Sequence, residues 1–170
     1  MIIIRNAKIE DIEGIANVLK ESYNIDSIDE AKKVFREEIK KGHNYIVAEQ
    51  LKTILGVVVW TVHDLPKHQL AELNRIAVLP EFRGKGVSRL LFNGLIKKSQ
   101  EFYKENSSKL RKIYLLTHES NKRAHAFYEK IGFKHETTLK NHYYKGEDER
   151  IYSIFFDEDK EKELDPSDKN

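Results

Sequence analysis

The chain has 170 residues, of which 39% are hydrophobic and 34% charged, and its 30 basic and 28 acidic side chains leave a net charge of only +2. This length suits one domain with a buried core. The balanced charge gives no basic face of the kind that nucleic acids require, so no nucleic-acid partner is expected. The absence of cysteine excludes disulfides, zinc–thiolate sites and a thiol nucleophile. The apolar start at residues 2–4 is too short for a signal sequence or a membrane span, so we expect a cytoplasmic protein without a membrane partner.

Hydrophobic periodicity predicts strands and helices along the whole chain. In the first half, the expected elements are a strand at 2–4, helices at 11–19 and 29–41, and strands at 45–49, 54–62 and 70–79. In the second half, they are a helix at 87–105, a strand at 113–118, a helix at 121–131, and a hairpin of 133–144 and 151–156 joined across 145–150. Residues 1–156 are therefore expected to form a single mixed α/β domain, and the charged residues 157–170 a disordered tail.

The run over residues 73–91 is predicted to pass from a strand through a glycine loop into the longest helix. Gly84 and Gly86 allow the backbone to approach an anion closely, and the unpaired N–H groups of the first helical turn point at it. Lys85 and Arg89 add positive charge at the rim. The run therefore indicates a pyrophosphate site, although two glycines also occur in tight connections that bind nothing.

Two other phosphate-binding loops do not fit this run. A dinucleotide-binding loop needs a third glycine, which Arg89 replaces here, and an acidic residue after the next strand, which is missing. The Walker A pattern is absent as well. Arg83, at the start of the loop, is expected either to touch phosphate or to fix the loop.

Arg83-Gly-Lys-Gly86-Val-Ser88, with Ala77-Val-Leu-Pro before it and Leu90-Leu91 after it, resembles the R/Q-x-x-G-x-G/A signature of the GNAT superfamily of N-acetyltransferases. A second block, residues 121–133, resembles the N-x-x-A-x-x-F/L-Y-x-K-x-G-F helix of the same superfamily. Ser88 departs from the Gly or Ala that is commoner at its position, but it is small. The resemblance in layout covers residues 1–156.

The resemblance implies an α/β (α+β) fold with a mixed, mostly antiparallel seven-stranded sheet and helices on both faces. The strands at 70–79 and 113–118 would splay apart, and the wedge between them would hold acetyl-CoA as co-substrate, without a metal. The main chain of Ile76 and Val78 would pair with pantetheine, the amides of 83–89 would hold pyrophosphate, and Asn121 would bind the pantetheine arm. The full implied set for the cofactor is Ile76, Ala77, Val78, Arg83, Gly84, Lys85, Gly86, Val87, Ser88, Arg89, Asn121, Ala124 and Tyr128.

Acetyl transfer to an amine requires a neutral lone pair, whereas an alkylamine is almost wholly protonated at neutral pH. Glu72, which resembles the glutamate base of the histone acetyltransferase branch, is the first choice as proton acceptor, although strand-edge glutamates are often merely solvated. His118, at the end of its strand, is the alternative. Tyr128 matches the tyrosine that protonates the leaving thiolate in the superfamily, with core packing as its other role. The oxyanion would meet a main-chain N–H near Val78.

The segment 142–148 resembles the last hairpin of N-terminal-amine acetyltransferases, so Tyr143, Tyr144 and Glu147 are expected to bind the acceptor. The ribosomal-protein branch carries a glutamate base where this chain has Leu116, so that base is missing. The resemblance therefore implies an enzyme that acetylates a protein N-terminus, a polyamine or another small amine by direct attack in a ternary complex. A non-catalytic acyl-CoA sensor is the alternative, and a homodimer is compatible with either. The histidines are not spaced as metal ligands.

Overall fold

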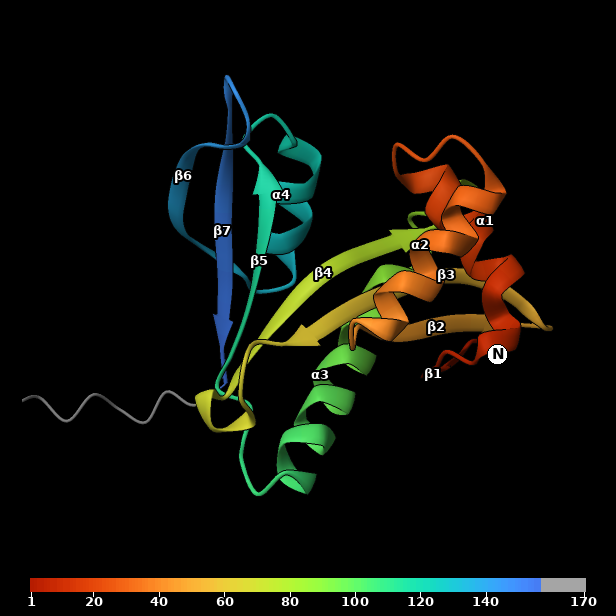
Figure 1. The fold of residues 1–170 in the computed structure, drawn as a ribbon, viewed down its shortest axis with the longest axis horizontal. Helices are drawn as coiled ribbons and strands as arrows, with labels where there is room; N and C mark the ends of the chain where they lie inside the picture. The colour runs from red at the N-terminus through yellow and green to blue at the C-terminus, as the bar shows by residue number, and fades with distance from the viewer. Residues whose placement is uncertain (157–170) are drawn as a thin grey trace, which may run out of the picture.

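Seven strands form one sheet with helices on both of its faces in the computed structural model, which describes residues 1–156 (Figure 1). The elements are β1 (Ile3–Asn6), η1 (Ile9–Asp11), α1 (Ile12–Ser22), α2 (Ile28–Lys40), β2 (Asn44–Gln50), β3 (Thr53–Val62), η2 (Pro66–His68), β4 (Leu70–Val78), η3 (Pro80–Phe82), α3 (Val87–Glu105), β5 (Lys112–His118), α4 (Lys122–Lys130), β6 (Lys134–Tyr144) and β7 (Glu147–Phe155). The strand order is β1-β2-β3-β4-β5-β7-β6, and only the β4–β5 pair is parallel. The expected mixed, mostly antiparallel fold is confirmed. The tail expected at 157–170 lies outside the described residues.

The central strand β3 shows how both faces of the sheet are covered. Val57 and Val59 pack in the cluster formed with α1 and α2, whereas Val58 and Trp60 pack in the cluster formed with α3. Successive side chains of a strand point to opposite faces, so a continuous run of β-branched residues is buried on both sides. No helix within residues 1–156 is long and apolar enough to cross a membrane.

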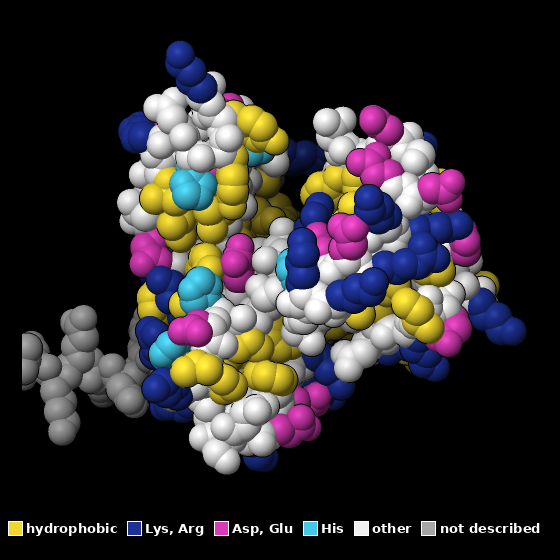
Figure 2. Space-filling view, viewed as in Figure 1, with side chains coloured by type: hydrophobic (Ala, Val, Ile, Leu, Met, Phe, Trp, Pro, Cys, Tyr) yellow, Lys and Arg dark blue, Asp and Glu magenta, His cyan; other side chains and the backbone are white. Residues whose placement is uncertain are grey.

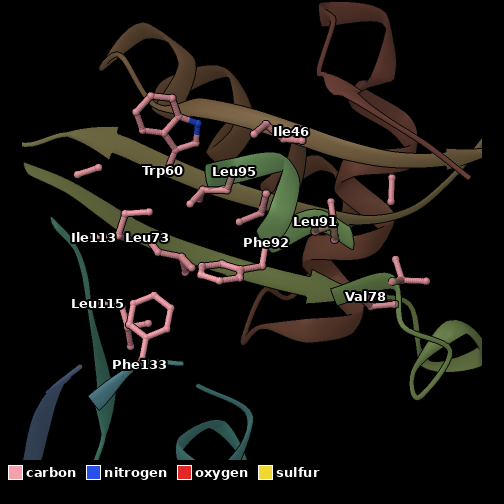
Figure 3. Packing of buried hydrophobic residues seen from close by; sticks show 14 of the residues in the cluster. Ile46, Trp60, Leu73, Val78, Leu91, Phe92, Leu95, Ile113, Leu115 and Phe133 are labelled. Atoms are coloured by element: carbon pink, nitrogen blue, oxygen red, sulfur yellow. The ribbon is translucent and has the colours of Figure 1, made fainter. Parts of the chain in front are cut away.

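One hydrophobic cluster connects the two halves of the sheet. Leu73 of β4, Phe92 of α3 and Leu115 of β5 belong to it, together with Phe133 just before β6 (Figure 3). The ring centroids of Phe92 and Phe133 are 5.4 Å apart. Helix α3 therefore packs against both halves and holds β5–β7 in a defined place relative to β1–β4.

The final hairpin differs from its prediction. The turn expected over 145–150 is wrong, because β7 already begins at Glu147 and only Lys145 and Gly146 separate the two strands. Gly146 has a φ of 86°, which suits a two-residue hairpin turn. The charged run 147–150 indicated a loop. In the structure each of its side chains has a hydrogen-bond or ion-pair partner, so these charged residues can occupy a strand.

Candidate active site

Strands β4 and β5 are paired over only three residues, 70–72 with 112–114. Beyond Glu72, β4 stays paired with β3 as far as Val78, while β5 continues beside β7. The two strands diverge in Figure 1, and Figure 2 shows a notch between the α1–α2 part and the part built from α4 and β5–β7. A cleft of about 1060 Å³ lies there, lined by residues of both halves. The expected wedge is present.

The main chain of β4 presents free hydrogen-bonding groups to this cleft. The N–H of Leu79 donates to β3 at 2.9 Å, and main-chain groups of successive strand residues point to opposite edges, so those of Ile76 and Val78 point into the cleft. Two contacts agree with this assignment: Arg83 Nε donates to Val78 O at 2.9 Å, and Tyr23 Oη donates to Ile76 O at 3.4 Å. The N–H groups of Ile76 and Val78 can therefore donate hydrogen bonds to an extended ligand. Such a ligand would bury these two donors and must supply acceptors for them, because buried backbone N–H groups need a partner.

The loop between β4 and α3 has the backbone geometry of an anion site. Gly84 and Gly86 have φ values of 74° and 81°, in the left-handed region that glycine adopts most readily. The carbonyl of Gly86 accepts the N–H of Leu90 at 3.1 Å, so the N–H groups of residues 87–89 have no partner within the helix. They form the positive end of the helix dipole. Gly84 and Ser88 line the cleft directly.

Arg83 holds this loop in place. Its Nε donates to Val78 O, and its Nη2 lies 3.5 Å from Glu21 O, so the structure favours the loop-fixing role over phosphate contact. Lys85 lies over the ring of Phe82, with 5.4 Å between Nζ and the ring centroid. Among the described residues, the cleft lining omits four members of the predicted cofactor set, namely Lys85, Gly86, Val87 and Arg89.

The start of α4 faces the same cleft. Asn121 caps the helix, because its Oδ1 accepts the N–H of Ala124 at 3.1 Å. Both residues line the cleft, and the amide nitrogen of Asn121 is free to donate to a ligand there. The structure thus brings Asn121, Ala124 and the β4 edge to one cleft.

Tyr128, one helical turn after Ala124, also lines the cleft. Its ring packs against Phe127 and Phe133, with centroids 5.4 and 5.8 Å away. Its hydroxyl makes no hydrogen bond to the described residues. Burial raises the pKa of Tyr128 above its ordinary value, with a smaller contribution from Tyr23. The phenol therefore keeps its proton at neutral pH and can donate it.

Glu72 lies at the point where β4 and β5 separate. It is paired in register with Tyr114 of β5, whose hydroxyl donates to Glu72 Oε2 at 2.9 Å. The same hydroxyl lies 2.8 Å from His63 Nδ1. Burial, and then the charge of Glu72, raise the pKa of Tyr114, so this hydroxyl stays a donor. Glu72 lines the cleft with one oxygen engaged by a tyrosine.

His118 is joined to a carboxylate that the sequence did not single out. Glu149 lies directly opposite it in the β5–β7 register, and His118 Nδ1 and Glu149 Oε1 form a short hydrogen bond. The Glu149 side chain is only 2% exposed, whereas that of His118 is 44% exposed. Both line the cleft. Glu149 lies in the run that was predicted to be a turn. Its spacing of two residues from Ile151, which places both on one face of a strand, was the signal that could have identified it.

The residues expected to bind the acceptor separate into two groups. Tyr143 and Tyr144 line the cleft and are 61% and 65% exposed, with the Tyr144 ring 5.8 Å from that of His118. Glu147 is absent from the lining formed by the described residues. Its Oε1 accepts the N–H of Ser120 at 2.9 Å, and this bond lowers the pKa of Glu147. Glu147 therefore ties the hairpin to the loop before α4.

A second polar cluster at the cleft was not foreseen. Glu38 of α2 accepts from Arg75 Nη2 at 2.6 Å and from Tyr45 Oη at 2.5 Å, and Arg75 lies 5.1 Å from the ring centroid of Tyr23. Burial raises the pKa of Tyr23 to about 12. Sequence reasoning had no signal for this cluster, because Glu38 and Arg75 are 37 positions apart.

Three buried polar atoms at the cleft lack a hydrogen-bond partner among the described residues. They are Ser22 Oγ, His43 Nδ1 and Asn74 Oδ1, and all three residues line the cleft. Buried polar atoms are rarely left unpaired, so Ser22 Oγ and Asn74 Oδ1 are available to a ligand, whereas His43 Nδ1 lies 3.8 Å from Glu38 Oε2. Within residues 1–156, no three His, Asp or Glu side chains come together as a metal site.

Comparisons with known proteins agree with this geometry. Residues 12–133 match the acetyltransferase (GNAT) family. An N-alpha-acetyltransferase of Saccharolobus solfataricus is 31% identical, over 85% of this chain and 87% of that protein. A spermidine/spermine N-acetyltransferase of Vibrio cholerae is 26% identical, with a TM-score of 0.68 over 91% of this chain and 92% of the other. The ribosomal-protein-S18-alanine N-acetyltransferase of Escherichia coli, 21% identical with a TM-score of 0.72 over 91% and 94%, shares the fold.

The family match spans most of the chain, and it includes the β4 edge, the glycine loop and the Asn121–Tyr128 helix that form the cleft. The chain therefore belongs to the GNAT family and is an acetyl-CoA-dependent N-acetyltransferase.

Proposed function

We propose that this enzyme acetylates the α-amino group of a protein or peptide N-terminus by direct attack within a ternary complex. The observation that carries the proposal is the cleft between β4 and β5. It brings together free main-chain donors, a helix N-terminus, an unpartnered tyrosine hydroxyl and a mouth lined by tyrosines.

The cleft fits acetyl-CoA at three places. The inward N–H groups of Ile76 and Val78 suit the amide groups of pantetheine, and the amide nitrogen of Asn121 suits the same arm. The first-turn amides of α3, behind Gly84 and Gly86, suit a pyrophosphate. Acetyl-CoA supplies the activated acetyl group as a thioester, and this chain holds and orients it.

The side chains at the divergence of β4 and β5 serve the transfer itself. A main-chain N–H near Val78 that pantetheine does not occupy stabilises negative charge on the thioester carbonyl oxygen as the amine attacks. Tyr128 donates a proton to the departing thiolate, because its free, protonated hydroxyl lies in the cleft. Glu72 adds a negative charge that attracts the cationic acceptor.

The cleft suits a peptide better than a polycation. Two of its carboxylates are already paired, Glu38 with Arg75 and Glu149 with His118. An extended peptide has amide groups that can satisfy unpartnered atoms such as Asn74 Oδ1, and apolar surface for exposed tyrosines such as Tyr143. The 31% identity with the N-alpha-acetyltransferase of Saccharolobus solfataricus supports the same acceptor class.

A polyamine is the second candidate, supported by the structural similarity to the spermidine/spermine enzyme of Vibrio cholerae. An acceptor screen decides between the two. Thiol release from acetyl-CoA is measured with peptides bearing free N-termini, the same peptides N-terminally blocked but containing lysine, spermidine, and free lysine. We expect release only with the free N-termini. Equal or faster release with spermidine would assign the enzyme to polyamines, and CoA binding without release for any amine would support a sensor.

A further inference from the structure

The buried carboxylate of Glu149 has no role in the chemistry described so far. A buried carboxylate is costly unless it is paired, and the partner that the structure gives Glu149 is Nδ1 of His118. The antiparallel register of β5 and β7 places the two residues directly opposite each other. This pairing is therefore built into the sheet and does not depend on a mobile side chain finding its partner.

We propose that His118 accepts the proton of the acceptor's ammonium group and that Glu149 is the positioning residue that prepares it. This inference rests on the proposed function, since it concerns the same amine. It adds a carboxylate–imidazole pair that neither the glycine loop nor the α4 motif contains.

The geometry determines which ring nitrogen is available. An ionised carboxylate only accepts hydrogen bonds, so a neutral His118 bonded to Glu149 must carry its proton on Nδ1. The lone pair is then on Nε2, the nitrogen that Glu149 does not engage, on a residue that lines the cleft. When Nε2 takes a proton, the buried negative charge of Glu149 stabilises the imidazolium, as the buried aspartate does in serine-protease triads.

Glu72 is placed for a different task. Its Oε2 is bonded to Tyr114, which in turn contacts His63, so it belongs to a chain of polar groups that reaches an exposed histidine. Glu149, in contrast, is 2% exposed, and its one titratable hydrogen-bond partner within residues 1–156 is His118. His118 combines a fixed orientation with 44% exposure of its side chain, which lets it release a proton to solvent.

The proton count closes with these residues. The acceptor ammonium gives one proton to Nε2 of His118, which passes it to solvent. The amine nitrogen then forms a bond to the acetyl carbon while the carbon–sulfur bond breaks. The nitrogen loses its second proton to solvent as the amide forms, and Tyr128, which gives its proton to the thiolate, is reprotonated from solvent. The net products are the amide, the thiol and one proton.

Several ionisable groups face His118 and bear on its pH response. They are Glu149 and Glu147 of β7, Tyr144 of β6 and His125 of α4, whose Nε2 lies 2.9 Å from the His118 carbonyl oxygen. The test therefore compares single changes at His118 and Glu149 with a matched change elsewhere. Glu136→Gln in β6 is that control, because Glu136 is paired with Lys112 and Ser153 outside the cleft lining.

Turnover with the best acceptor is measured for His118→Ala, Glu149→Gln and the double variant, with folding checked by circular dichroism. We expect kcat to fall about 100-fold or more in His118→Ala and roughly 10- to 100-fold in Glu149→Gln. The KM for acetyl-CoA and the activity of Glu136→Gln should stay unchanged.

The double variant should be no slower than His118→Ala, because Glu149 acts only through His118. The acid limb that an imidazole base imposes on the pH profile should vanish in His118→Ala. Unchanged kcat in Glu149→Gln, or full additivity in the double variant, would overturn the proposal.

A readout without acceptor separates this inference from the choice of substrate. Long-range proton–nitrogen NMR of the imidazole rings, with His118→Ala to assign the signal, should show His118 protonated at Nδ1 and not at Nε2, and Glu149→Leu should remove that preference. If this signature is present but no N-terminal peptide is acetylated, the substrate assignment fails and the positioning role stands. If Nε2 carries the proton in the wild type, the positioning role fails whatever the acceptor is.

Discussion

Tyr128 lines the cleft and Tyr114 bonds to Glu72, which also lines it, and these surroundings give the two tyrosines different roles. Tyr114 donates its hydroxyl to Glu72, whereas the hydroxyl of Tyr128 makes no hydrogen bond within the described residues. Burial raises the pKa of both, so both stay protonated at neutral pH. Of these two tyrosines, Tyr128 is therefore the one whose proton no described residue engages and that can give it to a leaving group.

Tyr128→Phe tests this assignment, because it keeps the ring packing and removes only the hydroxyl. Acetyl-CoA binding, measured by calorimetry, should persist, while turnover should fall roughly 10- to 1000-fold. Tyr103→Phe is the matched control: its hydroxyl bonds to Leu70 O on the β4 main chain, so its loss should lower stability and leave turnover unchanged. Turnover within a factor of two of the wild type would make Tyr128 a packing residue.

Glu72→Gln tests whether Glu72 attracts the acceptor or removes its proton. If Glu72 attracts a cation, the acceptor KM should rise about threefold to tenfold and become less sensitive to salt, with kcat nearly unchanged. Glu72→Asp, which keeps the charge, should restore most of the salt dependence. A fall in kcat that is rescued as pH rises would instead make Glu72 the base and remove that role from His118.

The segment from β4 through the glycine loop to α3 combines a free strand edge with a helix N-terminus, and each of these two features is common on its own. The strand edge provides inward N–H groups at Ile76 and Val78, and the glycines let the chain turn so that α3 starts facing the same space. Arg83 connects the two, since it bonds Val78 O from within the loop. The proposed cofactor site therefore depends on the whole segment and not on one side chain.

Gly86→Val should weaken CoA binding tenfold or more, about 1.4 kcal/mol, because a β-branched side chain strains a φ of 81° and obstructs approach of an anion. Gly42→Val is a close control for strain: Gly42 has a φ of 85° and also has no atom near its missing Cβ, but it lies between α2 and β2. Both variants should lose similar stability, and only Gly86→Val should lose affinity in calorimetry. Equal CoA affinities in the two folded variants would refute the pyrophosphate assignment.

The two halves of the molecule are held together away from the cleft. Tyr103, near the end of α3, bonds Leu70 O where β4 and β5 pair, whereas the first turn of α3 faces the opposite end, at which the two strands diverge and the cleft opens. The outer edge of the first half is secured separately. Arg5 of β1 bonds both oxygens of Asp11, at 2.7 and 2.8 Å, and also Glu49 of β2 at 2.7 Å.

Acid should weaken this edge in a predictable direction. The bond from Arg5, together with the N–H of Lys8, lowers the pKa of Asp11 in the folded protein. Its stabilisation is therefore fully present above the pKa of Asp11 in the unfolded chain, and it is lost as pH falls through the lower folded value. Asp11→Asn should reduce the free energy of unfolding by about 1 kcal/mol at pH 7, and the difference from wild type should shrink below pH of about 4.

Urea unfolding at a series of pH values measures this difference. Glu10→Gln is the control, because Glu10 is an exposed neighbour on η1 without an ion pair among the described residues, and it should leave stability nearly unchanged. A deficit in Asp11→Asn that is constant down to pH 2 would show that Asp11 acts through its shape and not through its charge.

The order of strands and helices and the glycine loop could be predicted from the sequence. Each depends on residues close together in the chain: alternating or helical spacing of apolar side chains, and glycine where φ is positive. The same local logic failed at the last hairpin, where the run of charges at 147–150 looked like a loop. Its partners are supplied by distant segments, so local pattern could not show that a strand tolerates it.

Long-range register supplied what the local pattern lacked. His118 and Glu149 are 31 positions apart, and they meet because β5 and β7 pair in one register; a slip of one residue would turn Glu149 to the other face. Arg75 and Glu38 are also far apart in the chain, and they meet because α2 packs on the sheet. The sequence by itself therefore pointed to the proposed acyl-donor residues, because they fall in two short segments, 76–89 and 121–128, whose patterns are local. The residues proposed to act on the acceptor amine lie on separate elements. Only the packing of β5 against β7 brings the buried carboxylate of Glu149 to the imidazole of His118.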